Sequence, residues 1–185
     1  MKTEHKFAEA LKNMMSDISL DNISVAALCK KCKVNRQTFY YHFHNIYDLL
    51  TLVYLDEKIN GLEKVKTIKE LMKAVYDYSI KNSKFIMATL NSAGKDLFEE
   101  FVYNAIYRTM YKLLSEAPDG KKLHANDRKS IARFYALGYS HSFVYYFSTH
   151  KTRSFDAMMN TFSFLGDNLL YQAILNFIDN KGKEK

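Results

Sequence analysis

The sequence predicts an all-α protein, with a three-helix helix-turn-helix domain first and a helical bundle after it. Two observations carry this prediction. The chain has one proline (Pro118) and six glycines in 185 residues, which are too few turn-forming residues for a protein built from strands. Apolar residues also recur every three or four positions nearly throughout, which is the period of an amphipathic helix.

Four short helices are expected at the N-terminal end. The first has Thr3 as its N-cap, and its apolar stripe consists of Phe7, Leu11, Met14 and Ile18. Ser24, Asn35 and Asn45 precede the other three helices, where their side-chain oxygens can accept hydrogen bonds from free backbone amides. Asp48 adds a carboxylate to the first turn of the fourth helix.

Longer and more apolar helices are expected beyond about residue 66. Their expected spans are 67–81, 84–92, 95–116, 127–149 and 155–179. The change from short, capped helices to long, aromatic ones lies near residue 50. We therefore divide the chain into domains at residues 1–50 and 51–185, with the fourth helix contributing to both.

Composition and charge narrow the class of protein further. The formal charge of +7 and the pI near 9.2 permit a polyanionic partner without requiring one. The segment MKTEHKFAEALKNMM carries too many charges for a signal peptide, and no run of about 18 apolar residues indicates a membrane span. We expect a cytoplasmic protein with no membrane partner, in which Cys29 and Cys32 stay reduced.

The stretch CKVNRQTFYYHFHN, residues 32–45, combines four aromatic rings with several polar side chains. If residues 36–43 form a helix, Phe39 and Phe43 share one face and can pack against Val34 and the preceding helix. The other faces carry Arg36, Gln37, Thr38, Tyr40, Tyr41 and His42. We therefore expect the two phenylalanines inside and the polar side chains outside.

The outward side chains match the chemistry of duplex DNA. Arginine can bond guanine O6 and N7 in a forked geometry, and glutamine can do the same for adenine N6 and N7. Threonine, tyrosine and histidine can donate hydrogen bonds to phosphate oxygens. Lys30, Lys31, Lys33 and Arg36 place four positive charges within seven residues. Two short helices joined by a three-residue turn form a helix-turn-helix, so this segment is a candidate for DNA binding. The alternative interpretation of residues 36–43 is an ordinary surface helix with exposed rings.

Residues 23–50, ISVAALCKKCKVNRQTFYYHFHNIYDLL, resemble the DNA-binding signature of the TetR family of bacterial transcription regulators. The resemblance includes the capped second helix, the TFYYHF segment, and the aspartate and leucines that open the fourth helix. RQTFYYHFHNIYDLL is also similar to the branch containing the dihydroxyacetone kinase regulator. The resemblance implies base contacts from Arg36, Gln37 and Tyr40. It implies phosphate contacts from Ser24, Thr38, Tyr41 and His42.

Two positions depart from the family pattern. Lys33 occupies the place of the usual turn glycine, so either a left-handed backbone there costs the lysine roughly 1 kcal/mol or the turn differs slightly. Ile46 stands where the family often has a phosphate-binding lysine, so Lys33 or His44 is the candidate to replace that contact.

Neither a metal site nor a catalytic site is predicted. Cys29-x-x-Cys32 and His42-x-His44 offer zinc-binding side chains, but a zinc finger has about twelve residues between its pairs and three to five between its histidines. On a helix the two histidines would also point about 200° apart. The sequence GYSHS at 138–142 lacks the last glycine and the preceding strand of a nucleophile elbow. We expect no cofactor and no enzymatic activity.

Helices 127–149 and 155–179 are expected to pair two copies of the chain in a four-helix interface. The last helix has a broad apolar stripe, Phe155, Met158, Phe162, Leu165, Leu169, Ala173 and Phe177. The helix before it has residues small enough for close approach, Ala132, Ala136, Gly138, Ser140 and Ser142. The alternative is the core of a monomer. In a homodimer, recognition helices about 34–36 Å apart would read a near-palindromic operator on double-stranded DNA.

The middle helices carry enough aromatic side chains to line an apolar pocket, although core packing is the simpler role for each of them. The candidate pocket residues are Tyr76, Phe85, Phe101, Tyr103, Tyr107 and His141. The resemblance implies that residues 51–185 bind a small-molecule effector, or dock a partner protein, and thereby change the DNA affinity by linkage.

The combined prediction is a homodimeric TetR-type regulator, with repression as the family's usual mode and activation left open. The alternative from another class is a helical effector- or protein-binding module with weak or no DNA binding of its own. Ile46 and Lys33, the two departures from the family pattern, favour that alternative.

Overall fold

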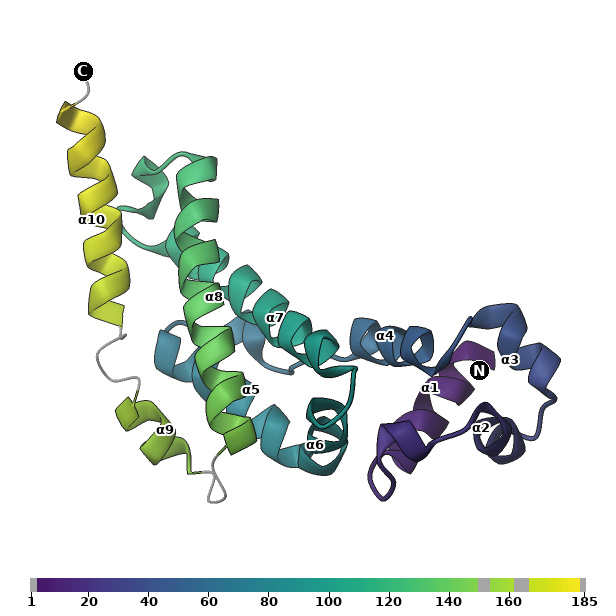
Figure 1. The fold of residues 1–185 in the computed structure, drawn as a ribbon. Coiled ribbons are helices and arrows are strands. Elements are labelled where there is room, and N and C mark those ends of the chain that lie inside the picture. The colour runs from purple at the N-terminus through teal and green to yellow at the C-terminus, as the bar shows by residue number, and fades with distance from the viewer. Residues whose placement is uncertain (1–2, 150–153, 162–166, 184–185) are drawn as a thin grey trace. The chain divides into compact units, whose positions relative to one another are not determined.

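The computed structural model describes residues 3–149, 154–161 and 167–183, whose regular elements are all helices, with no strand among them (Figure 1). The all-α prediction is confirmed. The chain forms two compact units, which we call the N-terminal unit (Met1–Lys58 and Ser79–Phe101) and the C-terminal unit (Ile59–Tyr78 and Val102–Lys185). Among the described residues, no helix has the length and apolarity to cross a membrane.

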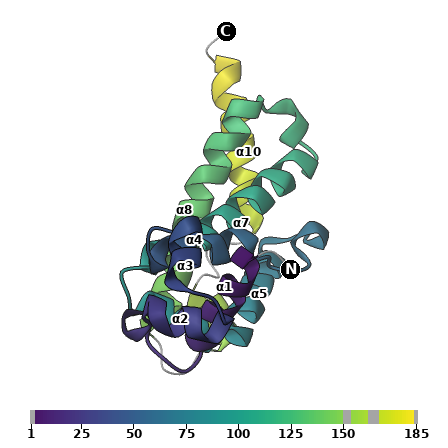
Figure 2. The same ribbon diagram turned by 90° about the vertical axis from the view of Figure 1, so that its right-hand side faces the viewer.

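The N-terminal unit contains the helix-turn-helix. Its helices are α1 (Thr3–Met14), α2 (Val25–Cys32), α3 (Arg36–His42), α4 (Ile46–Asp56) and α6 (Ser83–Leu90), with a short 3-10 helix η1 (Leu20–Asn22). It also holds the first residues of α7 (Lys95–Glu116). Figure 2 shows α1, α2 and α3 gathered together, with α2 and α3 joined by the predicted short turn.

Three of the four predicted N-caps are confirmed, whereas Thr3 is the first residue of α1 and not the residue before it. Ser24 Oγ accepts a hydrogen bond from the Ala27 amide at 3.2 Å. Asn35 Oδ1 accepts one from the Thr38 amide at 2.8 Å, and Asn45 caps α4 in the same way. These bonds satisfy amides that have no partner within their own helix, so each helix start is encoded locally.

Three phenylalanine rings form the core beneath α3. Phe7 of α1 contacts Phe39 at 5.3 Å and Phe43 at 6.1 Å between ring centroids, both edge to face, and all three side chains are buried. The prediction that Phe39 and Phe43 point inward is confirmed. The predicted stripe of α1 was wrong at its end: the buried residue is Met15, and Ile18 is 42% exposed. The regular helix ends at Met14, so the chain turns before Ile18 can reach the core.

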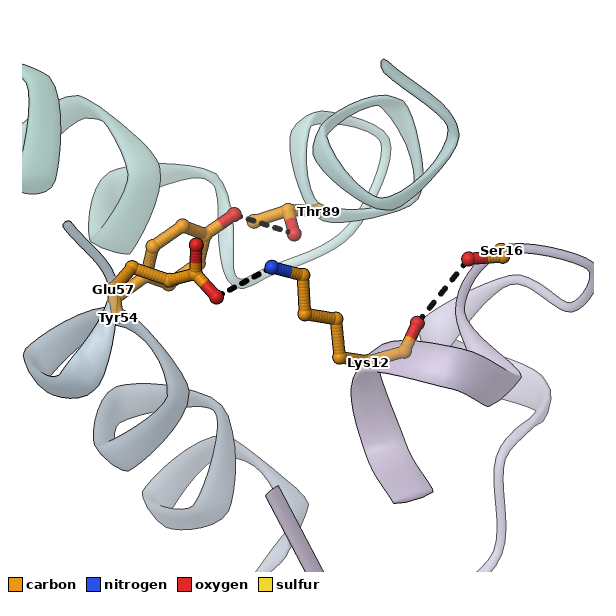
Figure 3. Close-up of polar contacts among 5 residues, drawn as sticks. All are labelled: Lys12, Ser16, Tyr54, Glu57 and Thr89. Atoms are coloured by element: carbon orange, nitrogen blue, oxygen red, sulfur yellow. Dashed lines mark hydrogen bonds and ion pairs between the residues drawn. The ribbon is translucent and has the colours of Figure 1, made fainter. Parts of the chain in front are cut away.

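A polar junction joins α1, α4 and α6 within the N-terminal unit (Figure 3). Lys12 of α1 forms an ion pair with Glu57, which caps the end of α4, and its ammonium lies 5.4 Å from the ring centroid of Phe85 in α6. Tyr54 of α4 donates a hydrogen bond to Thr89 of α6 at 2.9 Å, in a buried position. Burial raises the pKa of the Tyr54 hydroxyl, so this group stays protonated and neutral.

The C-terminal unit consists of longer helices. They are α5 (Ile68–Lys81), most of α7, α8 (Ala125–Thr149), α9 (Phe155–Thr161) and α10 (Asp167–Lys183), with 3-10 turns η2 (Leu62–Lys64) and η3 (Gly120–Lys122). Where the sequence predicted one helix over 155–179, the described residues form two helices, α9 and α10. Of its expected stripe, Phe162, Leu165 and Leu169 lie outside the residues whose side chains the structure describes.

The connection between α7 and α8 is held by polar contacts. The Arg128 guanidinium donates to the carbonyls of Gly120 at 3.0 Å and Leu123 at 2.6 Å. A side chain at position 120 would place its Cβ 1.6 Å from the Leu114 carbonyl oxygen, so only glycine fits this turn. Tyr171 of α10 donates to the Asp119 carboxylate at 3.1 Å, which attaches α10 to the same connection.

Candidate nucleic-acid interface

The predicted base-contacting side chains lie on the open face of α3. Arg36 and Gln37 are exposed, and Tyr40 is 57% exposed. The Tyr40 ring packs edge to face against Phe39 at 5.5 Å, which connects it to the buried aromatic core. The helix therefore presents a guanidinium, an amide and a phenol outward from a fixed backbone, as recognition of base edges requires.

The predicted phosphate-contacting residues differ in how free their side chains are. Tyr41 is 85% exposed. Ser24 Oγ accepts the capping bond from Ala27, which leaves its hydroxyl proton available to a phosphate oxygen. Thr38 is half-buried, and its hydroxyl lies 2.9 Å from Asn35 Oδ1, an oxygen that can only accept. Thr38 must break that bond before it can donate to phosphate. His42 is half-buried and pairs with Glu4 through Nδ1 at 3.2 Å.

Lys33 adopts the left-handed conformation that the family pattern reserves for glycine. Its φ and ψ are 55° and 45°. The Val34 amide donates to the Cys29 carbonyl at 3.0 Å and the Lys33 amide to the Lys30 carbonyl at 3.2 Å, the two bonds of a Schellman ending. The turn thus keeps its shape without glycine, at a cost of roughly 1 kcal/mol, and it presents an exposed lysine beside α3.

Four positive charges lie on this part of the surface. Lys30, Lys31, Lys33 and Arg36 are all exposed, and none has an ion-pair partner within the described ranges. At the start of α4, Ile46 is half-buried and His44 is exposed, so His44 is the side chain there with access to an anion.

Two residues near α3 were missed by reasoning from the sequence. Glu4 pairs with His42 across 38 positions of the chain, and the Tyr47 hydroxyl donates to Asp21 at 3.2 Å across 26 positions. Burial and this hydrogen bond raise the pKa of Tyr47. No local pattern could reveal either contact, because the partners lie on different elements.

The cysteines of α2 serve the packing of the helix. Cys29 is buried, and Cys32 is half-buried with its thiol donating to the Lys6 carbonyl of α1 at 3.6 Å. Burial raises the pKa of both thiols, which favours the protonated, less reactive form. Their positions are those expected of structural thiols.

The six candidate pocket residues fall into separate groups. Phe85 and Phe101 belong to the N-terminal unit, where both rings contact Tyr54, at 5.3 and 5.6 Å. The remaining four lie in the C-terminal unit. There Tyr103 and Tyr107 stack on each other at 5.9 Å, Tyr76 packs on Phe155 at 5.4 Å, and His141 is exposed on α8.

Helix α8 carries an exposed apolar face. Phe134 is 75%, Leu137 47% and Tyr145 69% exposed, with the exposed residues Gly138 and His141 between them. A Cβ at Gly138 would meet no atom within 4 Å. The other four small residues predicted for close approach do not belong to this exposed face. Ala132, Ala136 and Ser140 are buried within the chain and Ser142 is half-buried.

A capped helix pair whose second helix presents arginine, glutamine and tyrosine defines a helix-turn-helix protein. Comparison with known families then specifies the class. A family model described as "Transcriptional regulator C-terminal region", of the TetR type, matches residues 66–168, more than half of the chain. The chain therefore belongs to the TetR family of transcriptional regulators.

The chain is also similar to solved structures. One is the dihydroxyacetone kinase operon activator DhaS, with a TM-score of 0.61 and 21% identity over 93% of this chain and 96% of that chain. Another is the TetR family repressor AlkX from Dietzia sp. strain DQ12-45-1b, implicated in biodegradation of n-alkanes, with a TM-score of 0.60 and 16% identity over 92% and 96%. At these identities the likeness concerns the fold alone. A comparison with curated protein sequences found no match.

Proposed function

We propose that this TetR-family regulator binds a near-palindromic operator as a homodimer and represses transcription there. The α3 helix of each copy enters the major groove, where Arg36, Gln37 and Tyr40 contact base edges. Ser24, Lys33, Thr38, Tyr41 and His42 contact phosphates. In this proposal residues 1–50 are the DNA-binding domain, and residues 51–185 bind an effector and form the dimer.

A single observation carries the DNA-binding proposal. Arg36, Gln37 and Tyr40 are exposed on a helix whose opposite face is fixed by buried Phe39 against Phe7. A recognition helix needs both properties, because a side chain discriminates between bases only when its backbone is held in one position. The exposed lysines at 30, 31 and 33 supply the positive charge that attracts the DNA backbone.

The homodimer is supported by the exposed face of α8. Phe134, Leu137 and Tyr145 together present an apolar surface that a soluble monomer rarely leaves uncovered. Gly138, in the middle of this face, permits close approach of a second helix. A second copy suits the surface because a two-fold interface uses the same patch on both chains. Two copies are also what a near-palindromic operator requires.

Control by a small-molecule effector or a partner protein belongs to the same proposal. The family model covers residues 66–168, the region expected to receive the signal. The names of the two similar structures describe one activator and one repressor, so repression by this chain is part of our proposal and does not come from those names.

A selection and a salt titration test the proposal together. The protein should enrich a near-palindromic duplex from a random-sequence library, and the logarithm of its affinity should fall linearly with the logarithm of salt concentration. Arg36→Ala should cost about 1–3 kcal/mol and relax specificity at one base position. Arg108→Ala, which removes an exposed arginine of α7, is the control and should retain binding. A flat salt dependence with no enriched sequence contradicts the proposal.

The alternative is a helical effector- or protein-binding module with weak or no DNA binding. Ile46 is half-buried where the family often has a phosphate-binding lysine, and the hydroxyl of Thr38 is engaged with Asn35. The same titration decides between the two functions, because such a module would bind duplex DNA weakly at low salt and without sequence preference.

A further inference from the structure

The turn between α4 and η2 contains the single Asn–Gly pair of the sequence, Asn60 and Gly61. Asn60 is exposed, and Gly61 has a left-handed backbone with a φ of 87°. The Lys64 amide donates to the Gly61 carbonyl at 3.0 Å, which closes the turn. A Cβ at Gly61 would meet no atom within 4 Å, so the space around this glycine is open.

An asparagine followed by glycine can react within its own chain. The glycine backbone nitrogen attacks Cγ of the asparagine carboxamide and forms a new C–N bond. The bond from Cγ to the side-chain nitrogen breaks, and ammonia leaves with the proton that the glycine nitrogen gives up. The product is a cyclic imide, a succinimide. Water then opens the ring at either carbonyl, which gives aspartate or isoaspartate, in which the main chain runs through the former side chain.

Two features of the turn favour this attack. Glycine has no Cβ to hinder the approach of its nitrogen to the preceding side chain. Within the part of the chain that the structure describes, neither the Gly61 amide nor the Asn60 carboxamide makes a hydrogen bond. The nitrogen and the carbon that react are therefore not held by other partners, and water reaches the exposed Asn60 side chain.

The sequence has one other pair able to form a succinimide, Asp119–Gly120, and its contacts protect it. The Gly120 amide donates to the Ala117 carbonyl at 2.9 Å. The Asp119 carboxylate pairs with Lys122 at 2.6 Å and accepts a hydrogen bond from Tyr171 at 3.1 Å. Lys122 and Tyr171 hold the pKa of this carboxyl below its ordinary value. It therefore stays ionised, and a carboxylate is a much poorer electrophile than an amide.

We propose that Asn60 is a site of spontaneous modification, which converts it through a succinimide into aspartate and isoaspartate. The reaction needs no enzyme and no reagent except water. Isoaspartate adds a carbon atom to the main chain directly after the chain passes from the N-terminal to the C-terminal unit, between Lys58 and Ile59. Ile59 and Val65 are buried on either side of the turn. The longer backbone must therefore fit between two fixed points, which should destabilise the protein.

Peptide mapping of the folded full chain, incubated in mildly alkaline buffer well below its melting temperature, tests the proposal. The tryptic peptide 59–64 should gain the mass difference between an amide and an acid, and should separate into aspartate and isoaspartate forms. A sample digested without incubation corrects for conversion during digestion. Asn91–Ser92 is the internal control. Asn91 is exposed, but the Ser92 amide donates to the Thr89 carbonyl at 3.1 Å, so Asn91 should stay unmodified over the same period.

Two variants separate the chemistry from its consequence. Asn60→Ser removes the carboxamide and should abolish the mass change. Asn60→Asp, freshly prepared, has the new charge without the added backbone atom. The modified wild-type fraction, isolated by cation exchange, should therefore melt at a lower temperature than Asn60→Asp. Equal melting temperatures would refute the destabilisation by the longer backbone.

The assignment of the site has its own refutation. It fails if peptide 59–64 keeps its mass, or if Asn91 is converted as fast as Asn60. It also fails if only aspartate forms, because a succinimide opens to both products. No DNA enters these measurements, so their failure would leave the proposed function standing, and a failed operator selection would leave the modification of Asn60 standing.

Discussion

Phe7 lies outside the recognition helix but holds it in place. Its side chain is fully buried, and its ring meets both Phe39 and Phe43 edge to face. Phe7→Ala removes both contacts and leaves a cavity beneath α3. A buried Phe→Ala change lowers the free energy of unfolding by about 3–5 kcal/mol, and each aromatic pair contributes about 0.5–1.5 kcal/mol beyond burial. We therefore expect Phe7→Ala to lower the free energy of unfolding by about 4–5 kcal/mol, near the upper end of that range.

Urea denaturation followed by far-UV circular dichroism, at one fixed protein concentration, measures this loss. Because domains are stable by only about 5–15 kcal/mol, Phe7→Ala should remove a large share of the total. Phe7→Leu keeps most of the volume and should cost less than about 1.5 kcal/mol. Tyr41→Ala, at an 85% exposed position, is the control and should change stability by less than about 0.5 kcal/mol. If Phe7→Ala costs no more than this control, the ring does not anchor α3.

Three further predictions concern the turn, the polar junction and the dimer. Lys33→Gly should stabilise the protein by roughly 1 kcal/mol, seen as a higher melting temperature, because glycine adopts the left-handed backbone without steric cost. Burial raises the pKa of Tyr54 above its ordinary value of 10.0, so the folded state binds more protons than the unfolded state above about pH 10. The free energy of unfolding should therefore decline as pH rises above that point, and Tyr54→Phe should reduce the decline. Leu137→Glu should shift the protein from dimer to monomer in light scattering, because it places two carboxylates in the proposed interface.

For each of these three predictions, one specific result would contradict it. Lys33→Ala retains a Cβ and should give no stabilisation, so an equal gain in both variants would point to charge rather than backbone strain. An unchanged alkaline decline in Tyr54→Phe would exclude Tyr54 as its source. Leu55→Glu changes an exposed leucine of α4, outside α8, and should leave the dimer intact. A dimer that survives Leu137→Glu would place the interface elsewhere.

The sequence alone determined the features that depend on neighbouring residues. Ser24, Asn35 and Asn45 cap the helices that follow them, because a cap needs only its own side chain and the next few amides. The span 95–116 was predicted as it occurs in α7. The inward direction of Phe39 and Phe43 followed from their spacing, since positions four apart share one face of a helix.

Tertiary structure decided what those local elements meet. Phe7 as the anchor of α3, Glu4 as the partner of His42, and Glu57 as the partner of Lys12 all join residues far apart in sequence. Helix α8 could not be oriented from its pattern, because both of its faces carry small or apolar residues. Packing in the C-terminal unit buries Ala132 and Ala136. Spacing along a helix fixes which side chains share a face, whereas only the packing of whole helices fixes what that face touches.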